Sequence, residues 1–213
     1  MAEGVRHLEV VVPAVGDPPE DIGTGHPIRG VTEQVAADPS AWTPQLAALV
    51  GAMFEDLAPE WHLHHAPDRL APLVDALDRG GPFPGPVVEL GAGAGAGTEA
   101  LVARFGHVVA LDLAAGMLAR LRVQGASRVQ ADASVLPVAD GSIGTLVCVN
   151  MLLLAHEVRR VLAPGGALVW VNSIGERTPI HLSAEAVAAS LGDGFGVMAS
   201  RASWGTWAVA RRS

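Results

Sequence analysis

The sequence predicts an α/β protein with a mostly parallel, seven-stranded sheet that closes with a C-terminal antiparallel hairpin. Three observations predict this fold class. From Pro86 onward, short β-rich runs alternate with helical segments, which is typical of βαβ units. The first of these runs leads into a glycine-rich turn that opens a helix. The last two runs meet at a turn around Trp204-Gly205, which indicates a hairpin.

Length and composition indicate one domain with an N-terminal extension. The chain has 213 residues, of which 50% are apolar, so it can bury a core without disulfides or metals. The single cysteine, Cys148, lies in an apolar run and is expected to be a buried thiol in a reducing compartment. The sequence contains neither a signal-peptide pattern nor an apolar run of about 18 residues. We therefore expect a cytoplasmic protein that does not engage a membrane.

The charged residues argue against nucleic acid as a partner. The formal net charge is -8, and the 14 basic residues are scattered along the chain. All of them are arginine, and the chain also lacks tyrosine. This composition excludes Schiff-base lysine chemistry, a phosphate-binding loop that ends in Gly-Lys, and tyrosine acid catalysis.

The first 82 residues are expected to cap a core that spans residues 83–213. Residues 1–40 are rich in proline, glycine and aspartate, with one β-like run at residues 8–12, and we expect an extended arm there. Thr43-Pro44 then provides a helix N-cap, followed by an amphipathic stripe. A second helical stripe ends at Gly80-Gly81.

The core is expected to alternate strands and helices in chain order. Strands are expected at residues 87–90, 108–112, 128–131, 145–150, 167–172, 195–201 and 205–211. Helices are expected near residues 96–105, 114–123, 153–162 and 183–191.

The stretch VVELGAGAGAG at residues 87–97 is the most informative, because in it the first strand runs into a glycine turn. Its glycines let a ligand approach the backbone closely. Gly91, Gly93 and Ala96 also satisfy the dinucleotide pattern, in which pyrophosphate binds a helix N-terminus. Glu89 helps to distinguish a dinucleotide from a sulfonium cofactor. A carboxylate before the glycines opposes pyrophosphate and suits the amino end of a sulfonium cofactor. A tight strand-to-helix connection without a ligand is the structural alternative.

Further motifs follow at regular spacing. Asp112 ends the second strand about twenty residues beyond the glycines, where an acidic side chain can accept both hydroxyls of a ribose. The other motifs are Met117-Leu118, Ala131-Asp132 with Leu136-Pro137, and the run RVLAPGG from Arg160 to Gly166. With these motifs the chain resembles the class I S-adenosylmethionine (SAM)-dependent methyltransferases, in the large family that includes the ubiquinone and menaquinone methyltransferases. The resemblance covers residues 87–172 and implies a Rossmann-like fold.

The resemblance also implies SAM as cofactor, S-adenosylhomocysteine (SAH) as product, and a role for each matching residue. The glycine turn holds the methionine part, Asp112 the ribose, and Asp132 the adenine, whose amine a carboxylate can accept. Met117 supplies an apolar wall, and Asn150 and Met151 line the sulfonium pocket. The expected cofactor-binding residues are Glu89, Gly91, Ala92, Gly93, Asp112, Leu113, Met117, Asp132, Ala133, Asn150 and Met151. A turn or cap role for Asp132 and simple helix packing for Met117 remain alternatives.

The segment EWHLHH at residues 60–65 carries the candidate catalytic residues. His62 and His65 are expected to act beside the acceptor, because a histidine can serve as general base near neutral pH. We expect no metal site, since a zinc site built on His62, His64 and His65 lacks a fourth ligand and the usual spacing. A structural or solvated role for these histidines, and a core position for Trp61, stay open.

The sequence therefore predicts methyl transfer to a small-molecule acceptor by direct displacement, in which proximity and alignment supply much of the acceleration. The segment after Asn150 is short, so we expect the acceptor site to depend on the N-terminal region. One alternative is an NAD(P)-dependent oxidoreductase, which leaves Glu89 and the Asp132 motif unexplained. The other is a cofactor-binding scaffold or regulatory protein without turnover.

Overall fold

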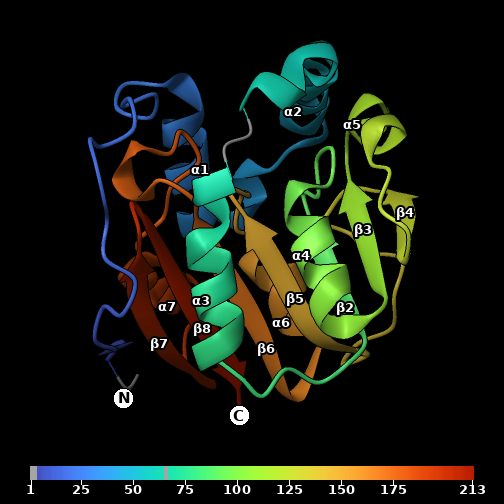
Figure 1. Ribbon diagram of the computed structural model, residues 1–213. Coiled ribbons are helices and arrows are strands. Elements are labelled where there is room, and N and C mark those ends of the chain that lie inside the picture. The colour runs from blue at the N-terminus through green and yellow to red at the C-terminus, as the bar shows by residue number, and fades with distance from the viewer. Residues whose placement is uncertain (1–3, 65–66) are drawn as a thin grey trace.

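The computed structural model describes residues 4–64 and 67–213, without the side chains of residues 62–64, 67 and 68. In this part of the chain, eight strands form one sheet (Figure 1). They are β1 (Arg6–His7), β2 (Val87–Leu90), β3 (Val108–Asp112), β4 (Ala126–Gln130), β5 (Ile143–Val149), β6 (Leu162–Asn172), β7 (Phe195–Ala202) and β8 (Gly205–Arg212).

The sheet confirms the predicted architecture and adds one strand to it. The strand order is β1-β7-β8-β6-β5-β2-β3-β4, and only β8 runs antiparallel to its neighbours β6 and β7. From β2 the chain proceeds outward through β3 to β4, and it then returns to the other side of β2 with β5 and β6. The chain order therefore reverses between β2 and β5, which marks the expected ligand position in an open sheet. The additional strand is β1, which pairs in parallel with β7.

Helices cover both faces of the sheet. The α-helices are α1 (Pro27–Ala37), α2 (Pro44–Leu57), α3 (Ala71–Arg79), α4 (Ala96–Phe105), α5 (Ala115–Arg120), α6 (Ala155–Val161) and α7 (Ala184–Leu191). Short 3-10 helices are η1 (Pro39–Ala41), η2 (Ala58–His64), η3 (Pro67–Leu70) and η4 (Gly175–Arg177). Helices α3 and α4 pack on one face, and α6 and α7 pack on the other (Figure 1).

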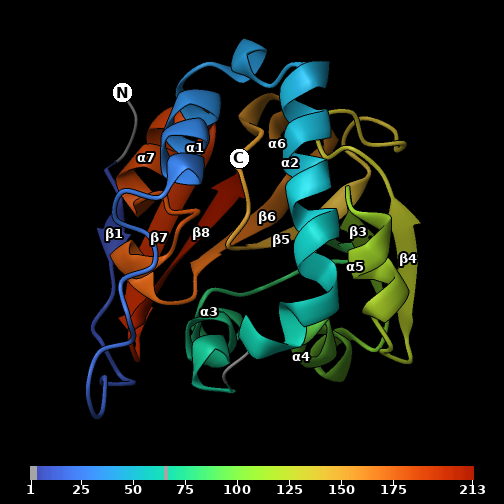
Figure 2. The same ribbon diagram turned by 90° about the horizontal axis from the view of Figure 1, so that it is seen from above.

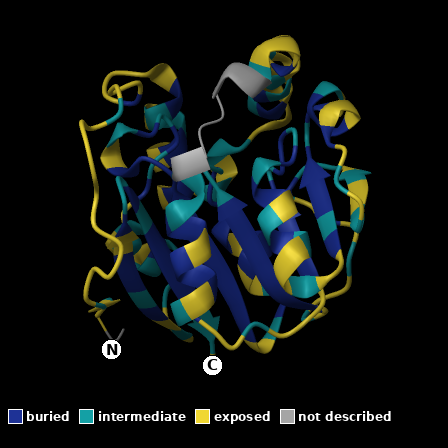
Figure 3. Ribbon diagram, in the orientation of Figure 1, coloured by how far each residue is buried: buried dark blue, intermediate teal, exposed yellow. Residues whose placement is uncertain are grey.

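The central strands are buried on both faces, which explains their nearly continuous apolar runs (Figure 3). On one face, Leu73 and Leu101 pack against strand residues such as Val169. On the other, Val187 packs with strand residues including Trp170. Cys148 in β5 is buried as predicted, and burial raises the pKa of its thiol well above the ordinary value.

Residues 27–37 correct the prediction of an extended arm, because they form helix α1. Pro27 takes the first helical position, and His26 Nδ1 accepts a hydrogen bond from the Ile28 N–H at 3.2 Å. Ile28, Thr32 and Val35 lie on the buried side of the helix at helical spacing. The proline- and glycine-rich composition around this short stripe concealed it.

Helix α2 begins as predicted and crosses above the carboxyl ends of the strands (Figure 2). The Thr43 side chain accepts a hydrogen bond from the Leu46 N–H at 3.2 Å, and Pro44 follows at the first helical position. Other predicted boundaries shift slightly. Helix α5 stops at Arg120 because Leu121 adopts an extended conformation, and the strand expected at residues 128–131 lies at Ala126–Gln130. The β-like run at residues 8–12 contributes one isolated bridge, from Val12 to Ala202.

Candidate functional site

A cavity of about 790 Å³ opens at the carboxyl edge of the sheet, beneath α2 and beside the point where the chain order reverses. This is where ligands bind in open α/β sheets, and the volume is ample for a nucleotide-sized cofactor. The described lining includes every cofactor-binding residue expected from the sequence: Glu89, Gly91, Ala92, Gly93, Asp112, Leu113, Met117, Asp132, Ala133, Asn150 and Met151.

Glycines give the turn after β2 its shape. Gly91 and Gly93 have φ values of 69° and 55°, in the left-handed region that favours glycine. A Cβ at Gly91 would lie 2.5 Å from Met151 Sδ, and a Cβ at Gly97 would lie 2.5 Å from Glu89 Oε1. The absence of side chains therefore brings the backbone of the turn and of α4 into close contact with Met151 and Glu89.

Glu89 is a carboxyl group buried directly behind this turn, with only 2% of its surface exposed. Its Oε2 accepts a hydrogen bond from the Thr98 hydroxyl at 2.5 Å. Burial raises the pKa of Glu89 to about 8; the Thr98 hydrogen bond opposes the shift and the charge of Asp112 adds to it. A cation that reached this carboxyl group would favour its ionised form.

Backbone N–H groups hold Asp112 at the end of β3. Gly93 donates to Oδ2 at 2.8 Å and Ala114 to Oδ1 at 2.9 Å. Burial nevertheless raises the pKa of the Asp112 carboxyl above its ordinary value, against the effect of these hydrogen bonds. Because each carboxylate oxygen can accept more than one hydrogen bond, Asp112 keeps acceptor capacity for a ligand hydroxyl pair.

Asp132 has a partner that the sequence analysis missed. The Trp42 indole N–H lies 3.0 Å from Oδ1 and 3.1 Å from Oδ2, and the Ser134 N–H donates to Oδ1 at 2.8 Å. Trp42 directly follows η1 and lines the same cavity. No spacing signal links residues 90 positions apart, so this contact cannot be predicted from local sequence patterns.

Asn150 joins the ends of β5 and β6. It has a φ of 50°, its Nδ2 donates to Ser173 Oγ at 2.8 Å, and its Oδ1 accepts from the Ser173 N–H at 2.8 Å. Both ends of the Asn150 amide are therefore engaged by Ser173. Met151 lies directly over Gly91 at the adjacent position.

The N-terminal region covers the glycine turn. A Cβ at Gly93 would lie 3.2 Å from Trp61 Nε1, so the Trp61 indole lies against the turn. Phe54 and Trp61 meet edge to face with ring centroids 5.8 Å apart, and both pack on a small apolar cluster that includes Met117. This packing excludes water from one side of the cavity.

The two expected catalytic histidines follow Trp61 in the chain. The backbone of His62 belongs to η2, and its side chain is not among the described ones. His65 lies outside the described residues. Their catalytic role stays a prediction.

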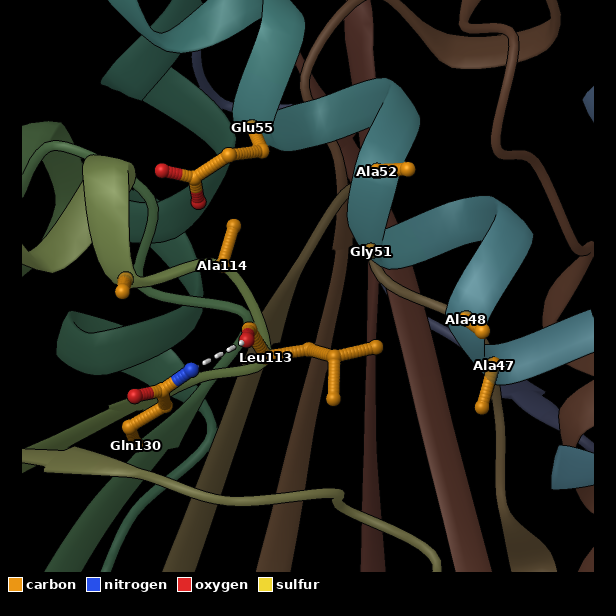
Figure 4. A pocket seen from close by; sticks show the side chains of 9 residues that line it. Ala47, Ala48, Gly51, Ala52, Glu55, Leu113, Ala114 and Gln130 are labelled. Atoms are coloured by element: carbon orange, nitrogen blue, oxygen red, sulfur yellow. Dashed lines mark hydrogen bonds between the residues drawn. The ribbon is translucent and has the colours of Figure 1, made fainter.

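A second, smaller hollow of about 320 Å³ lies between α2 and the loop after β3 (Figure 4). Gly51 lets α2 approach closely, since a Cβ there would lie 3.3 Å from Leu113 Cδ2. Glu55 accepts a hydrogen bond from the Gly116 N–H at 2.8 Å, and Gln130 donates to the Leu113 carbonyl at 3.2 Å. The Glu55 contact fastens α2 to the start of α5, and the Gln130 contact fastens β4 to the loop that follows Asp112.

The remaining motifs have a structural explanation away from the cavity. The Arg160 guanidinium donates to the Leu136 carbonyl at 3.0 Å and to Asp140 at 2.6 Å. Glu157, which also bonds Arg160, accepts from the Leu136 N–H at 2.5 Å. This network locks the connection between β4 and β5 and so supports the loop that begins at Asp132.

The described residues contain no group of three or more His, Cys, Asp or Glu side chains arranged to hold a metal ion. Within the same part of the chain, no helix is long and apolar enough to cross a membrane.

Comparison of the sequence with known proteins identifies a methyltransferase domain at residues 88–170. A relative is the malonyl-[acyl-carrier protein] O-methyltransferase of Methylococcus capsulatus, which is 38% identical over 116 residues. The match covers 48% of this chain and 42% of that enzyme. A second relative, the biotin biosynthesis bifunctional protein BioHC of Cellvibrio japonicus, is 36% identical over 45% of this chain and 21% of its own length. This chain thus spans less than half of the curated relatives it matches.

Solved structures share the fold at low sequence identity. The DhpI–SAH complex superposes with a TM-score of 0.64 at 19% identity, covering 76% of this chain and 94% of that one. A SAM-dependent methyltransferase from Aquifex aeolicus gives a TM-score of 0.60 at 18% identity, covering 72% and 97%. These structures show the fold alone, and the family model matches residues 88–170 as a methyltransferase domain. The narrower likeness to the ubiquinone and menaquinone enzymes stays a prediction.

Proposed function

We propose that this chain, which belongs to the class I SAM-dependent methyltransferases, transfers a methyl group from SAM to a small-molecule acceptor. The observation that carries the proposal is the buried Glu89 carboxyl group behind the glycine turn, with Asp112 and Asp132 further along the same cavity. Three acidic groups suit an ammonium, a ribose diol and an adenine amine. Glu89, directly before the glycines, would oppose the pyrophosphate of a nicotinamide cofactor.

The cavity residues fit SAM part by part. Glu89 and the bare glycine turn are suited to the amino acid end, because a desolvated carboxylate pairs strongly with an ammonium. Asp112 retains acceptor capacity for the ribose, and Asp132 for the adenine amine. Met117 and Leu113 supply apolar surface along the same wall.

When bound, SAM supplies a methyl group on a positively charged sulfur, and the sulfur keeps the bonding electron pair when the methyl leaves. The work of the chain is to align the acceptor with that methyl group and to exclude water. Trp61 and Phe54 close one side of the cavity, and the Asn150–Ser173 pair fixes the ends of β5 and β6 beneath it. If the acceptor must lose a proton, we assign that step to His62 or His65, which follow Trp61 in the chain.

Isothermal titration with SAH and with NAD tests the proposal. We expect SAH to bind and NAD to give no measurable heat. Tight NAD binding without a response to SAH would instead identify an oxidoreductase.

A screen with methyl-labelled SAM and a panel of small acceptors then tests turnover. Label appearing in an extracted product supports the enzyme. SAH binding with no transfer across the panel would favour a cofactor-binding scaffold.

A further inference from the structure

We propose that the acceptor is an uncharged molecule with an apolar body, bound in the half of the cavity between α1 and the segment after η4. This inference rests on the proposed function, since it assigns the space that SAM leaves free. The acceptor would then differ in charge from that of the malonyl-[acyl-carrier protein] O-methyltransferase, since a malonyl group carries a free carboxylate.

Buried hydrocarbon side chains form the wall of this half. Ile28 of α1, Leu152 after β5 and Ile180 after η4 are 5%, 4% and 7% exposed and pack in one cluster. All three also line the cavity, where they are joined by Met53 and Phe54 of α2. Three separate parts of the chain thus converge on one apolar surface, which suits the body of an apolar ligand.

The polar side chains in this half already have partners within the protein. Ser173 accepts from Asn150 Nδ2 at 2.8 Å, and Thr178 Oγ1 accepts from the Ile174 N–H at 3.3 Å. In both contacts the hydroxyl oxygen accepts, so the protein meets part of the hydrogen-bonding capacity of each side chain, and each O–H remains a donor for an uncharged oxygen of the acceptor.

Cationic side chains are placed away from this wall or are engaged. Arg29, next to Ile28 in sequence, donates to the carbonyls of Gly23 and Thr178, at 3.2 and 2.7 Å, and to that of Glu176. Arg69 also lines the cavity, but it belongs to η3 at the start of α3, which packs on the sheet face opposite to α1.

His26 is the titratable group that the described lining places in this half. Its Nδ1 accepts from the Ile28 N–H at 3.2 Å, so in the neutral ring the proton is on Nε2. That N–H is a donor for a hydroxyl or carbonyl oxygen of the acceptor. A carboxylate packed against the buried wall of Ile28, Leu152 and Ile180 would lose more hydration than a neutral oxygen in the same position.

Two probes of matched shape test the inference on the full chain loaded with SAH. The probes are 2-naphthol, which is uncharged at neutral pH, and 2-naphthoate, which is anionic. We expect 2-naphthol to bind at least about tenfold more tightly, as judged by equilibrium dialysis, because only the anion pays the cost of desolvation. Equal binding, a preference for 2-naphthoate, or no binding of either probe would overturn the inference.

A charge placed on the cavity wall should reverse the preference. Ile22 lines the cavity and is 39% exposed, so Ile22→Arg is expected to fold and to favour 2-naphthoate over 2-naphthol. Leu49→Arg makes the same change in charge on the outer side of α2, at a position 67% exposed, and should keep the wild-type preference. If both variants behave alike, the probes bind elsewhere and the inference is wrong.

SAH binding, measured beforehand by titration, separates the two claims. A protein that binds SAH and prefers 2-naphthoate contradicts the acceptor class alone. A protein that fails to bind SAH removes the proposed function, and the acceptor assignment with it.

Discussion

The two halves of the cavity are built in different ways. On the side of β2 and β3, the backbone itself forms the site: glycines at positive φ make the turn, and main-chain N–H groups hold Asp112. On the side of α1 and η4, the wall consists of side chains that distant segments bring together, such as Ile28 and Ile180. A site made by backbone conformation leaves a motif in the sequence, whereas a wall made by packing leaves only apolar residues at ordinary spacing.

The largest expected effect concerns the N-terminal side of the cavity. We expect His62→Ala or His65→Ala to lower kcat by about a hundredfold, which is the lower end of general acid–base contributions. SAH affinity should change little. The measurement is steady-state kinetics with an acceptor found in the screen. His107→Ala, at an exposed position bonded to Ser127, is the matched control. Full activity in both variants would make these histidines structural and leave the acceptor side without a base.

The strand-end side is tested by Asp112→Ala. Losing hydrogen bonds from a charged group should weaken SAH binding by about 1.5 to 3 kcal/mol, or roughly ten- to a hundredfold. Titration calorimetry measures the affinity, and a thermal melt verifies that the variant is folded. Asp193→Ala, at an exposed position, should bind as the wild type does. Unchanged affinity in a folded Asp112→Ala protein would remove this residue from the site.

The pH dependence of binding examines Glu89 in the same half. With a pKa of about 8 in the free protein, Glu89 is mostly protonated at pH 6 and must lose its proton to pair with an ammonium. SAH affinity should therefore rise by up to about tenfold per pH unit from pH 6 toward pH 8, where the ligand amine itself begins to lose its proton. Glu89→Gln should lose this dependence and bind about tenfold more weakly at pH 8. A wild-type affinity that is flat across this range would contradict the pairing.

Glu89 should also affect stability in the opposite direction. Its folded pKa lies above the ordinary value of 4.5, so its contribution to the stability of the free protein is complete below pH 4.5 and is lost as the pH rises through about 8. Glu89→Gln should accordingly raise the melting temperature of the free protein at pH 9 relative to wild type, with a smaller gain at pH 6. Equal gains at both pH values would mean that Glu89 does not titrate in this range.

The same contrast explains what the sequence could and could not predict. The strands of the core, the hairpin and the acids at the strand ends follow from local patterns, because each β-rich run, glycine turn and terminal acid is contiguous in the chain. Helix α1 was missed because only a few apolar positions, Ile28 to Val35, carry its period within a region rich in proline and glycine. Trp42 was missed because its contact depends on how the N-terminal region folds over residues 90 positions away.

Trp42→Phe tests whether the two halves of the cavity are coupled. Its expected effect on SAH affinity is the smallest of those predicted. The change removes the indole N–H that lies 3.0 Å from Asp132 Oδ1 and keeps an aromatic ring among Leu46 and its apolar neighbours. Asp132 then keeps the Ser134 N–H but loses the donor that orients its other oxygen. SAH affinity should fall by about 0.5 to 1.5 kcal/mol, or roughly two- to tenfold, as for one hydrogen bond.

A coupling measurement distinguishes this role from simple packing. Trp42→Phe and Asp132→Asn are combined, and SAH affinity is measured for both single variants and the double variant. If Trp42 acts by orienting the Asp132 carboxylate, the double variant should lose less than the sum of the single losses, because the same interaction is removed twice. Trp204→Phe in the β7–β8 turn serves as control and should leave the affinity unchanged. Strictly additive losses for Trp42→Phe and Asp132→Asn would show that the two residues affect SAH binding independently, although their side chains are in contact.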